Sequence, residues 1–534
     1  MKRYLFLIII FLAFLLRFLF LGTNPPSLTW DETAWGYNAY SIGIDGKDEF
    51  GKFLPLTYIE SFGDFKPPMY MYLSVLSIKF FGLNEFSVRF ASAFFGVLSV
   101  LVTYYLVHEI FSKKHINLAL LSAFVLAISP WHIMLSRGAF EANVATFFVL
   151  FGMFLFLKSI NQRPYLLIFS VISFVLSMYT FNSPRIVVPV LVVILCIVYF
   201  KKLVKNFKIT FIAGIAGILL FLPLFLFVQT PQAQLRFNEV NIFTDISIIK
   251  RTNQEIKNDN NAFFSKIIHN RRLAYGVEYV RHYFDNLTPK FLFITGDGNP
   301  KFSIQDVGQL YIWEIPFFIA GIIFLFRKRE GHFWIVPVWL LVGIIPAGFA
   351  RETPHALRIE SSLPMFQILT AIGVYYLLTM VSKNTKAIAA GVLSFVIFIN
   401  FVYFSQNYFV HYSPEFSSEW QYGYKEAVNY ADSARNNYKN IYITESLGRP
   451  YIYFLFYSRY SPQAFRSEAE VEREVFGFVH VNSFSNYKFT KNIAGIRETG
   501  ALYISRPQEK PEKGKILKEF KSLNGKIALI AYTI

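Results

Sequence analysis

Residues 138–157 read GAFEANVATFFVLFGMFLFL, and this stretch contains a single ionisable side chain, Glu141. About 20 predominantly apolar residues are needed for a helix to cross the hydrocarbon core of a bilayer. Similar apolar runs occur elsewhere along the chain, at 4–22, 88–110, 116–131, 165–181, 185–200, 209–228, 311–326, 333–349, 359–380 and 387–409. The sequence therefore predicts an α-helical integral membrane protein with about eleven transmembrane helices.

The composition agrees with that class. The chain has 534 residues, of which 54% are hydrophobic and 16% charged, and its mean hydropathy is +0.39. The net charge of +17 would indicate a nucleic-acid partner in a soluble domain. Here much of the basic excess lies in short loops such as 201–208 and 327–329, as the positive-inside rule requires. The single cysteine, Cys196, excludes an intrachain disulfide and a cysteine-based metal site.

The basic loops also predict a topology. With the N-terminus in the cytoplasm, every short inner loop is basic, and the apolar segment 69–82 is too short to cross and becomes a helix along the outer surface. Residues 1–410 then form a multi-pass domain in the cell membrane, with outer loops at 23–87 and 229–310. Function is expected on that outer face.

The tail, 411–534, is predicted to be a small extracytoplasmic α/β domain. Its expected strands are KNIYITES, FGFVHVNSF, ALYISRP and KIALIAYTI, and its expected helices are YKEAVNYADSA and SEAEVEREV.

Two adjacent carboxylates, Asp31 and Glu32, follow the first apolar run in the sequence WDETAWGYNAY (30–40). Neighbouring residues on a helix do not face each other, so the two are not expected to share a proton. One of them is a candidate catalytic base. The alternative is that Asp31 only caps the helix that follows it, since aspartate is a preferred N-cap residue.

The predicted outer region also carries basic residues. Lys66, in DFKPPMYMYL (64–73), is held by two prolines and suits a phosphate, although an interfacial lysine can also simply extend its amine to water. Arg137 and Glu141, in SRGAFEAN (136–143), are spaced i,i+4 and are expected to share one helix face. A structural ion pair is the alternative for them.

Two further helix starts carry basic side chains. In TPHALR (353–358), Thr353 suits an N-cap and His355 and Arg358 follow it; NSPR (182–185) repeats the design with Arg185. A helix N-terminus has free N–H groups and partial positive charge, so each is a candidate phosphate site. Simple anchoring of a helix end is the alternative.

The outer region therefore combines carboxylates with cations beside a lipid phase. Such a set suits transfer of a group from a membrane-bound phosphate carrier, because cations stabilise the leaving phosphate and a carboxylate accepts the proton of the acceptor. The sequence contains no phosphate-binding glycine-rich loop of the P-loop kind, which fits a lipid-linked donor better than a nucleotide.

The order of these motifs resembles a known superfamily. A first span followed by WDE, KPPMYMYL, SVRFASAFFGVLSV (87–100) and SRGAFEAN is similar to the GT-C glycosyltransferases, and most to the branch of the protein O-mannosyltransferases and the lipid A aminoarabinose transferase. The similarity covers about residues 1–200. It implies a membrane enzyme that transfers a sugar, with inversion, from a polyprenyl-phosphate donor to a lipid, glycan or protein acceptor.

The resemblance also implies roles for individual residues. Asp31 corresponds to the general base, Glu32 to its neighbour in the acidic pair, Glu141 to the second acid, and Lys66 to a contact of the carrier phosphate. Arg137, Arg185, His355 and Arg358 rest on the phosphate argument above. No cofactor is implied, and no essential metal is expected, although some GT-C members bind a divalent metal with such acids.

Two alternatives remain at this point. A pyrophosphate-linked glycan ligase or polymerase would use the same outer carboxylates and cations. A flippase for a polyprenyl-linked lipid would instead be expected to carry polar sites near the bilayer midplane, in paired halves of the chain.

Overall fold

The computed structural model describes residues 2–111, 115–234, 241–473 and 479–534. Its α-helices in the first half are α1 (Lys2–Phe18), α2 (Trp30–Asp45), α3 (Met69–Phe81), α4 (Glu85–Phe111), α5 (Ile116–Ile128), α6 (Pro130–Arg137), α7 (Glu141–Asn161), α8 (Leu166–Thr180), α9 (Pro184–Val198), α10 (Phe200–Lys205) and α11 (Phe207–Val228). Those of the second half are α13 (Ile246–Asn258), α14 (Phe263–Ile268), α15 (Arg271–Asp285), α16 (Glu314–Lys328), α17 (Ile335–Gly348), α18 (Met365–Met380), α19 (Lys383–Gln406), α20 (Tyr412–Phe416), α21 (Tyr424–Ser433), α22 (Pro450–Tyr457) and α23 (Pro462–Glu468).

Short helical turns and strands complete the described chain. The turns are η2 (Ile242–Thr244), η3 (Lys290–Ile294), η4 (Glu360–Ser362), η5 (Asn407–His411), η6 (Arg435–Asn437), η7 (Ile493–Gly495) and η8 (Pro507–Glu509). The strands are β1 (Ile59–Ser61), β2 (Asp64–Lys66), β3 (Ile441–Thr444), β4 (Glu470–Arg473), β5 (Val479–Phe484), β6 (Tyr487–Thr490), β7 (Leu502–Ser505), β8 (Lys515–Lys521) and β9 (Ile527–Thr533).

The chain divides into two compact units. The helical unit consists of Met1–Leu16, Phe95–Leu135 and Glu141–Phe404. The loop–tail unit consists of Arg17–Phe94, Ser136–Phe140 and Ser405–Ile534, so the first loop groups with the C-terminal tail. The predicted domain boundary near residue 410 remains a prediction. Part of the predicted outer loop 229–310, residues 235–240, lies outside the described residues, as do the first residues of the FGFVHVNSF segment.

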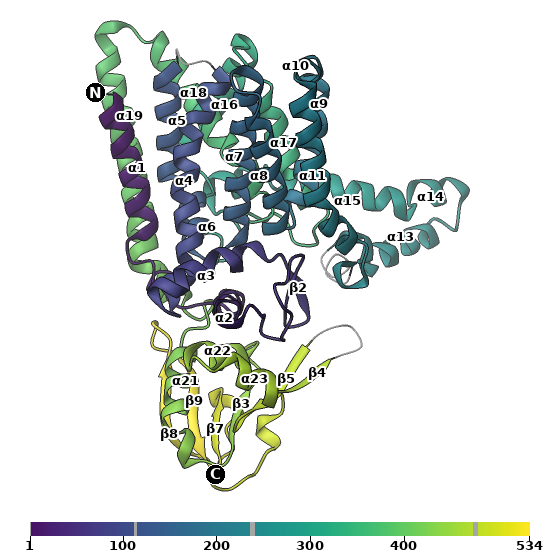
Figure 1. Ribbon diagram of the computed structural model, residues 1–534, viewed down its shortest axis with the longest axis vertical. Coiled ribbons are helices and arrows are strands. Elements are labelled where there is room, and N and C mark those ends of the chain that lie inside the picture. The colour runs from purple at the N-terminus through teal and green to yellow at the C-terminus, as the bar shows by residue number, and fades with distance from the viewer. Residues whose placement is uncertain (1, 112–114, 235–240, 474–478) are drawn as a thin grey trace. The chain divides into compact units, whose positions relative to one another are not determined.

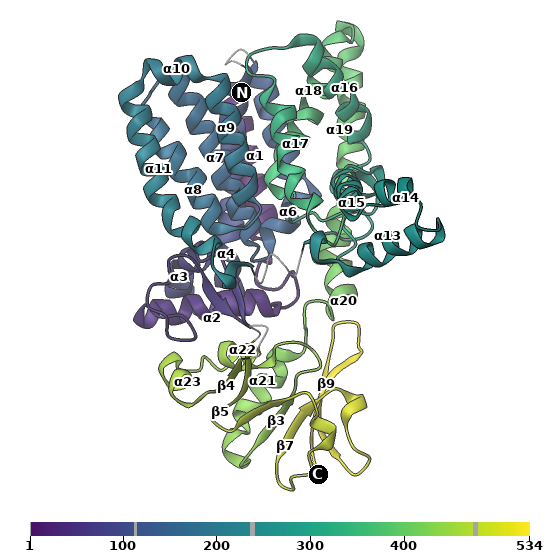
Figure 2. The ribbon, with the colours of Figure 1, turned by 90° about the vertical axis from the view of Figure 1, so that its right-hand side faces the viewer.

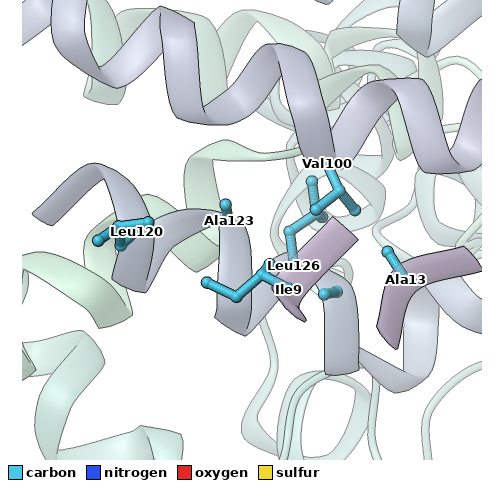
Figure 3. Close-up of a cluster of buried hydrophobic side chains, with 7 residues drawn as sticks. Ile9, Ala13, Val100, Leu120, Ala123 and Leu126 are labelled. Atoms are coloured by element: carbon cyan, nitrogen blue, oxygen red, sulfur yellow. The ribbon is translucent and has the colours of Figure 1, made fainter. Parts of the chain in front are cut away.

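The helical unit is built from apolar helices packed side by side, among them α7, α8 and α9 (Figure 2). One of its buried clusters joins Ile9 and Ala13 of α1, Val100 of α4 and Leu126 of α5 (Figure 3). The backbones of helices α16 and α18 lie very close to each other. A Cβ on Gly321 would lie only 1.9 Å from the carbonyl oxygen of Leu369, so this position requires glycine. Small residues of this kind let helix backbones meet inside a membrane.

Each predicted apolar run contains a helix in the structure. Five helical segments of the described chain are long and apolar enough to cross a membrane, namely Glu85–Phe111, Glu141–Asn161, Phe207–Val228, Glu360–Met380 and Lys383–Phe416. If the helices α5 and α6, which are bent by 56° relative to each other, form one broken span, the number of such segments in the described chain rises to six. The predicted class of helical membrane protein is confirmed, whereas the number of eleven crossings stays a prediction. The short segment from Met69 is indeed a separate helix, α3.

The tail forms the seven-stranded sheet β4-β5-β6-β3-β7-β9-β8, in which only β3 pairs with its two neighbours in parallel (Figure 1). The four predicted strands correspond to β3, β5, β7 and β9, and α21 confirms the first predicted helix. The second predicted helix, SEAEVEREV, is wrong, because α23 ends at Glu468 and strand β4 follows. The helix preference of its glutamates is outweighed by pairing with β5, which gives β4 its backbone hydrogen bonds.

Candidate active site

The N-cap of helix α2 lies two residues before Asp31, the N-cap candidate in the sequence. The N-cap residue is Thr29, whose side chain accepts a hydrogen bond from the backbone N–H of Glu32 at 3.2 Å, while Glu32 Oε2 accepts from the backbone N–H of Thr29 at 3.0 Å. This reciprocal pair is a capping box. The alternative role of Asp31 as the N-cap is therefore wrong, and its carboxylate does not cap the helix.

Glu32 is a buried structural residue in this unit. Its Oε1 accepts hydrogen bonds from Arg89 Nε and from the backbone N–H of Ala139, both at 2.9 Å. Arg89, fully buried in α4, also donates to the carbonyl oxygens of Leu21, Pro25 and Ser27. Because its oxygens are occupied by donors, Glu32 stabilises the chain around Asp31 and is poorly suited to accept a proton.

Asp31 and Lys66 are brought together by a tight hairpin. Strands β1 and β2 are joined by Phe62 and Gly63, whose φ angles of 61° and 78° are the left-handed values that a two-residue hairpin turn requires. Lys66 ends β2, with its Nζ 3.5 Å from Asp31 Oδ1 and 2.7 Å from Asp64 Oδ2. The Asp31 side chain is 43% exposed and that of Lys66 15%. An accessible carboxylate thus lies beside a firmly held ammonium group.

A buried polar network holds this hairpin against α2. Asn38 Nδ2 donates to Ser61 Oγ at 3.1 Å, and Ser61 Oγ donates to Glu49 Oε1 at 2.9 Å. Glu49 is fully buried, and among the described residues its Oε2 has no hydrogen-bond partner. Burial raises the pKa of the Glu49 carboxyl to about 8. The group is therefore mostly protonated at neutral pH.

Arg137 is also part of the loop–tail unit, and it is fully buried. It donates to the carbonyl oxygen of Asn24 at 2.8 Å, and its guanidinium lies 4.9 Å from the Phe409 ring centroid. The predicted i,i+4 pair with Glu141 is wrong as a helix-face pair, because α6 ends at Arg137 and α7 begins at Glu141 after a break. Gly138 and its neighbours interrupt the helix there.

Glu141 is the first residue of α7 in the helical unit, and a second acidic residue, Glu360, lies near it. Turn η4 packs against α7, and Glu141 acts electrostatically on Glu360. Glu360 is fully buried, and neither of its carboxylate oxygens has a hydrogen-bond partner in the described chain. Glu360 is not among the residues predicted from the sequence, although an acid at the edge of a predicted apolar run is a signal for such a site.

Arg185 lies in the first turn of α9, which begins with Pro184 as expected. Its Nε donates to the carbonyl oxygen of Met178 at 3.1 Å. Its Nη2 atom is buried and, within the described ranges, has no hydrogen-bond partner. This nitrogen is therefore a free donor close to a helix N-terminus.

The segment from Thr353 to Arg358 is not a helix start, so the phosphate argument based on a helix N-terminus is wrong there. Turns and η4 precede α18, which begins only at Met365. The segment is held instead by Asp297, whose Oδ2 accepts a hydrogen bond from the backbone N–H of Ala356 at 2.6 Å. Burial raises the pKa of the Asp297 carboxyl to about 6. Prolines at 354 and 364 prevent a regular helix from including this stretch.

His355 lies in the same segment and carries no charge at neutral pH. Burial, together with the charge of Arg358, lowers the pKa of its imidazole to about 3. Its Nδ1 is 3.9 Å from Asp297 Oδ2, a separation that is not an ion pair when the imidazole is neutral. Arg358, which is partly exposed, remains the cation of this segment.

The eight predicted site residues thus fall into two groups. Asp31, Glu32, Lys66 and Arg137 belong to the loop–tail unit, and Glu141, Arg185, His355 and Arg358 belong to the helical unit. In the ranges that the structure describes, no three or more His, Cys, Asp or Glu side chains are placed to hold a metal ion.

The N-terminal part of the chain matches the model of a known protein family. The family model described as dolichyl-phosphate-mannose-protein mannosyltransferase matches residues 7–239. A curated protein of Aquifex aeolicus (strain VF5), itself described only as uncharacterized, is 32% identical over 136 residues, which are 24% of this chain and 27% of that relative. The alignment therefore spans about a quarter of either protein.

Solved structures share the fold over nearly the whole length. The crystal structure of ArnT from Cupriavidus metallidurans in the apo state matches with a TM-score of 0.54 and 12% identity, covering 98% of this chain and 97% of that one. The same protein bound to undecaprenyl phosphate matches with a TM-score of 0.55 and 11% identity, over the same shares of the two chains.

Proposed function

We propose that the chain is a membrane glycosyltransferase of the GT-C superfamily that transfers a sugar from a polyprenyl-phosphate donor to a lipid, glycan or protein acceptor on the outer face of the cell membrane. The observation that supports this reaction most directly is the proximity of Asp31 and Lys66, 3.5 Å apart in one compact unit. This pair supplies a proton acceptor and a phosphate-binding cation at one location.

In the proposed reaction, Asp31 accepts the proton of the acceptor hydroxyl or amine as the acceptor attacks the anomeric carbon of the donor. The bond between that carbon and the carrier phosphate breaks, its electron pair leaves with the phosphate, and the configuration inverts. Lys66 stabilises the charge that develops on the leaving phosphate. The ArnT structure with bound undecaprenyl phosphate supports this choice of donor, because that protein shares the fold.

The other predicted residues take secondary parts in this proposal. Arg185 and Arg358 are candidate contacts of the carrier phosphate, and His355 is a neutral neighbour of Arg358. Glu141, with Glu360 beside it, is a candidate for orienting the acceptor. Glu32 and Arg137 act through the structure that they stabilise. The reaction as written requires no metal ion.

The experiment is release of free polyprenyl phosphate by the purified full-length protein, offered a panel of polyprenyl-phosphate sugars and a crude membrane extract as acceptor. Asp31→Asn is expected to retain donor binding and to lose turnover, because the amide keeps the shape of the side chain and removes the proton acceptor. Asp306→Asn, which changes an exposed carboxylate, is the matched control.

Three outcomes would contradict the proposal. Turnover of Asp31→Asn equal to that of the unmodified chain would remove Asp31 from the mechanism. In a parallel arm with a polyprenyl-pyrophosphate glycan as donor, release of carrier pyrophosphate there, without release of polyprenyl phosphate from the panel, would indicate a glycan ligase or polymerase. Movement of the donor across vesicles without its cleavage would indicate a flippase. An arm with a chelator tests the metal independence of the reaction.

A further inference from the structure

An apolar groove of about 370 Å³ lies in the helical unit between α8, α9 and α11. Its lining includes Phe174, Met178, Leu195 and Phe221. Cavities of roughly 300–1,000 Å³ are the usual size of sites for small ligands. The groove is thus large enough to hold part of a lipid.

The polar groups of the groove are already satisfied. Its two hydroxyl side chains belong to Ser170, which donates to the carbonyl oxygen of Gly152 at 2.7 Å, and Thr210, which donates to that of Leu203 at 2.8 Å. A ligand in the groove therefore meets an almost entirely apolar surface, which suits an alkyl chain and not a sugar or a peptide.

Glycines in α11 create this space. A Cβ on Gly217 would lie 2.7 Å from Val171 Cγ1, so a glycine there lets α11 approach α8. A Cβ on Gly214 would meet nothing within 4 Å, so that position is open space. Both glycines line the groove, and α11 is otherwise strongly exposed and apolar, as a surface facing lipid would be.

The helix at one end of the groove carries several basic side chains. Helix α10 connects α9 to α11 at the end of the bundle (Figure 2). Leu203 of α10 lines the groove and lies between Lys202 and Lys205 in the sequence. We define the α10 lysines as Lys201, Lys202 and Lys205 of α10 together with Lys208 at the start of α11, all of which are exposed. Within the described part of the chain, none of the four forms an ion pair with a carboxylate.

We propose that this groove binds one acyl chain of an anionic glycerophospholipid whose headgroup phosphate lies on the α10 lysines. The apolar lining selects a hydrocarbon chain, and the adjacent basic cluster selects a negatively charged headgroup. The proposal does not depend on the glycosyltransferase reaction, because it uses none of the residues assigned to that site.

The location can be tested with the only cysteine of the chain. Cys196 lines the groove and is exposed, so a benzophenone maleimide can be attached there without any substitution. The labelled full-length protein is reconstituted in phosphatidylcholine vesicles containing phosphatidylglycerol and is then irradiated. Cross-linking to phosphatidylglycerol well above its share of the lipid is expected. Cross-linking in proportion to the lipid composition would overturn the selectivity for an anionic headgroup.

The two halves of the site are then tested separately by native mass spectrometry of lipids retained by the detergent-purified protein. Lys202→Ala with Lys205→Ala is expected to reduce the retained phosphatidylglycerol about tenfold, because each lysine near an anionic headgroup adds to affinity. Lys383→Ala with Lys386→Ala, at the start of α19, is the control for loss of two charges elsewhere.

Gly214→Leu is expected to fill the groove and to displace the lipid without loss of thermal stability. Gly391→Leu in α19 is its control, since a Cβ there also meets nothing within 4 Å and the position does not line the groove. Unchanged lipid retention in Gly214→Leu would overturn the groove as the binding site. Preferential retention of added polyprenyl phosphate over phosphatidylglycerol would overturn the assigned lipid class.

Discussion

The Nζ atom of Lys66 lies 3.5 Å from Oδ1 of Asp31, although 35 positions separate the two residues in the sequence. The hairpin of β1 and β2 produces this proximity, and Asp64 holds the ammonium group from the other side at 2.7 Å. In the proposed reaction, the carrier phosphate and the reacting acceptor must meet at this pair.

Lys66→Met is expected to weaken binding of polyprenyl phosphate by about tenfold or more, since hydrogen bonds to charged groups contribute roughly 1.5–3 kcal/mol. Lys66→Arg is expected to retain much of the affinity because it keeps the charge. Binding of radiolabelled polyprenyl phosphate to the purified protein measures the effect. Lys52→Met, an exposed lysine of the same loop, is the control. Equal affinity in Lys66→Met and the unmodified protein would remove Lys66 from the phosphate site.

Arg89→Ala is expected to destabilise the protein by about 3–5 kcal/mol, because it leaves the buried carboxylate of Glu32 without its partner. Glu32→Gln should also lower the unfolding temperature, unlike Asp31→Asn, which should affect turnover alone. A double-mutant cycle of Arg89→Met and Glu32→Leu by thermal unfolding measures the coupling. Additive losses in the double variant would show that the two side chains do not act as a pair.

Glu49→Gln is expected to make the protein more stable above neutral pH. In the unfolded chain the carboxyl has its usual pKa of 4.5, and in the folded chain burial raises its pKa to about 8. Between these values the folded state binds a proton that the unfolded state has lost, so stability falls as the pH rises, by a total on the order of a few kcal/mol.

Thermal unfolding across this pH range tests that expectation. The decline should be shallower in Glu49→Gln than in the unmodified protein, while Glu512→Gln, at an exposed position, should leave it unchanged. The same slope in all three proteins would contradict the buried, protonated state of Glu49.

Gly36→Ala is expected to lower both the unfolding temperature and turnover. A Cβ at this position of α2 would lie 2.5 Å from Phe456 Cε2 and 2.6 Å from Val88 Cγ2, so α22 or α4 must shift away from the helix that carries Asp31. Overpacking of this kind costs about 1–3 kcal/mol. Gly43→Ala in the same helix, where the nearest atom would be 3.4 Å away, is the control. A stabilised Gly36→Ala protein would refute the close packing.

Arg358→Ala is expected to weaken donor binding more than His355→Gln does. The pKa of His355, lowered to about 3 by burial, leaves the imidazole neutral throughout the neutral pH range, so its loss removes no positive charge. Affinity for polyprenyl phosphate, measured at several pH values, checks this. A titration near neutral pH that disappears in His355→Gln would show that the histidine does carry charge.

Much of the fold could be predicted because it depends on local patterns. Apolar runs near 88–110 and 138–157 predict helices, since a helix in a membrane satisfies its own backbone hydrogen bonds. Four strands of the tail followed from their alternating apolar residues. The prediction of a helix for SEAEVEREV is wrong because the local preference of this segment is helical. The strand β4 forms instead through pairing with β5, which the local sequence does not reveal.

The candidate site could be predicted only in part. Asp31, Lys66 and Glu141 were identified from their residue types in unusual surroundings, yet the sequence alone did not indicate that Glu32 is occupied by Arg89, 57 positions away. Nor did it indicate the buried, unsatisfied carboxylate of Glu360. Such features depend on which distant segments come together.

Local sequence patterns are enough to predict a helical membrane protein with a strand-rich tail, because hydrophobicity and periodicity are properties of neighbouring residues. Three features become visible only in the folded chain: Asp31 contacts Lys66, Arg137 and Glu141 lie on different helices, and no helix begins at Thr353. Those outcomes depend on packing and hydrogen bonding between residues far apart in the chain, and these interactions outweigh the small free-energy differences that local preferences provide.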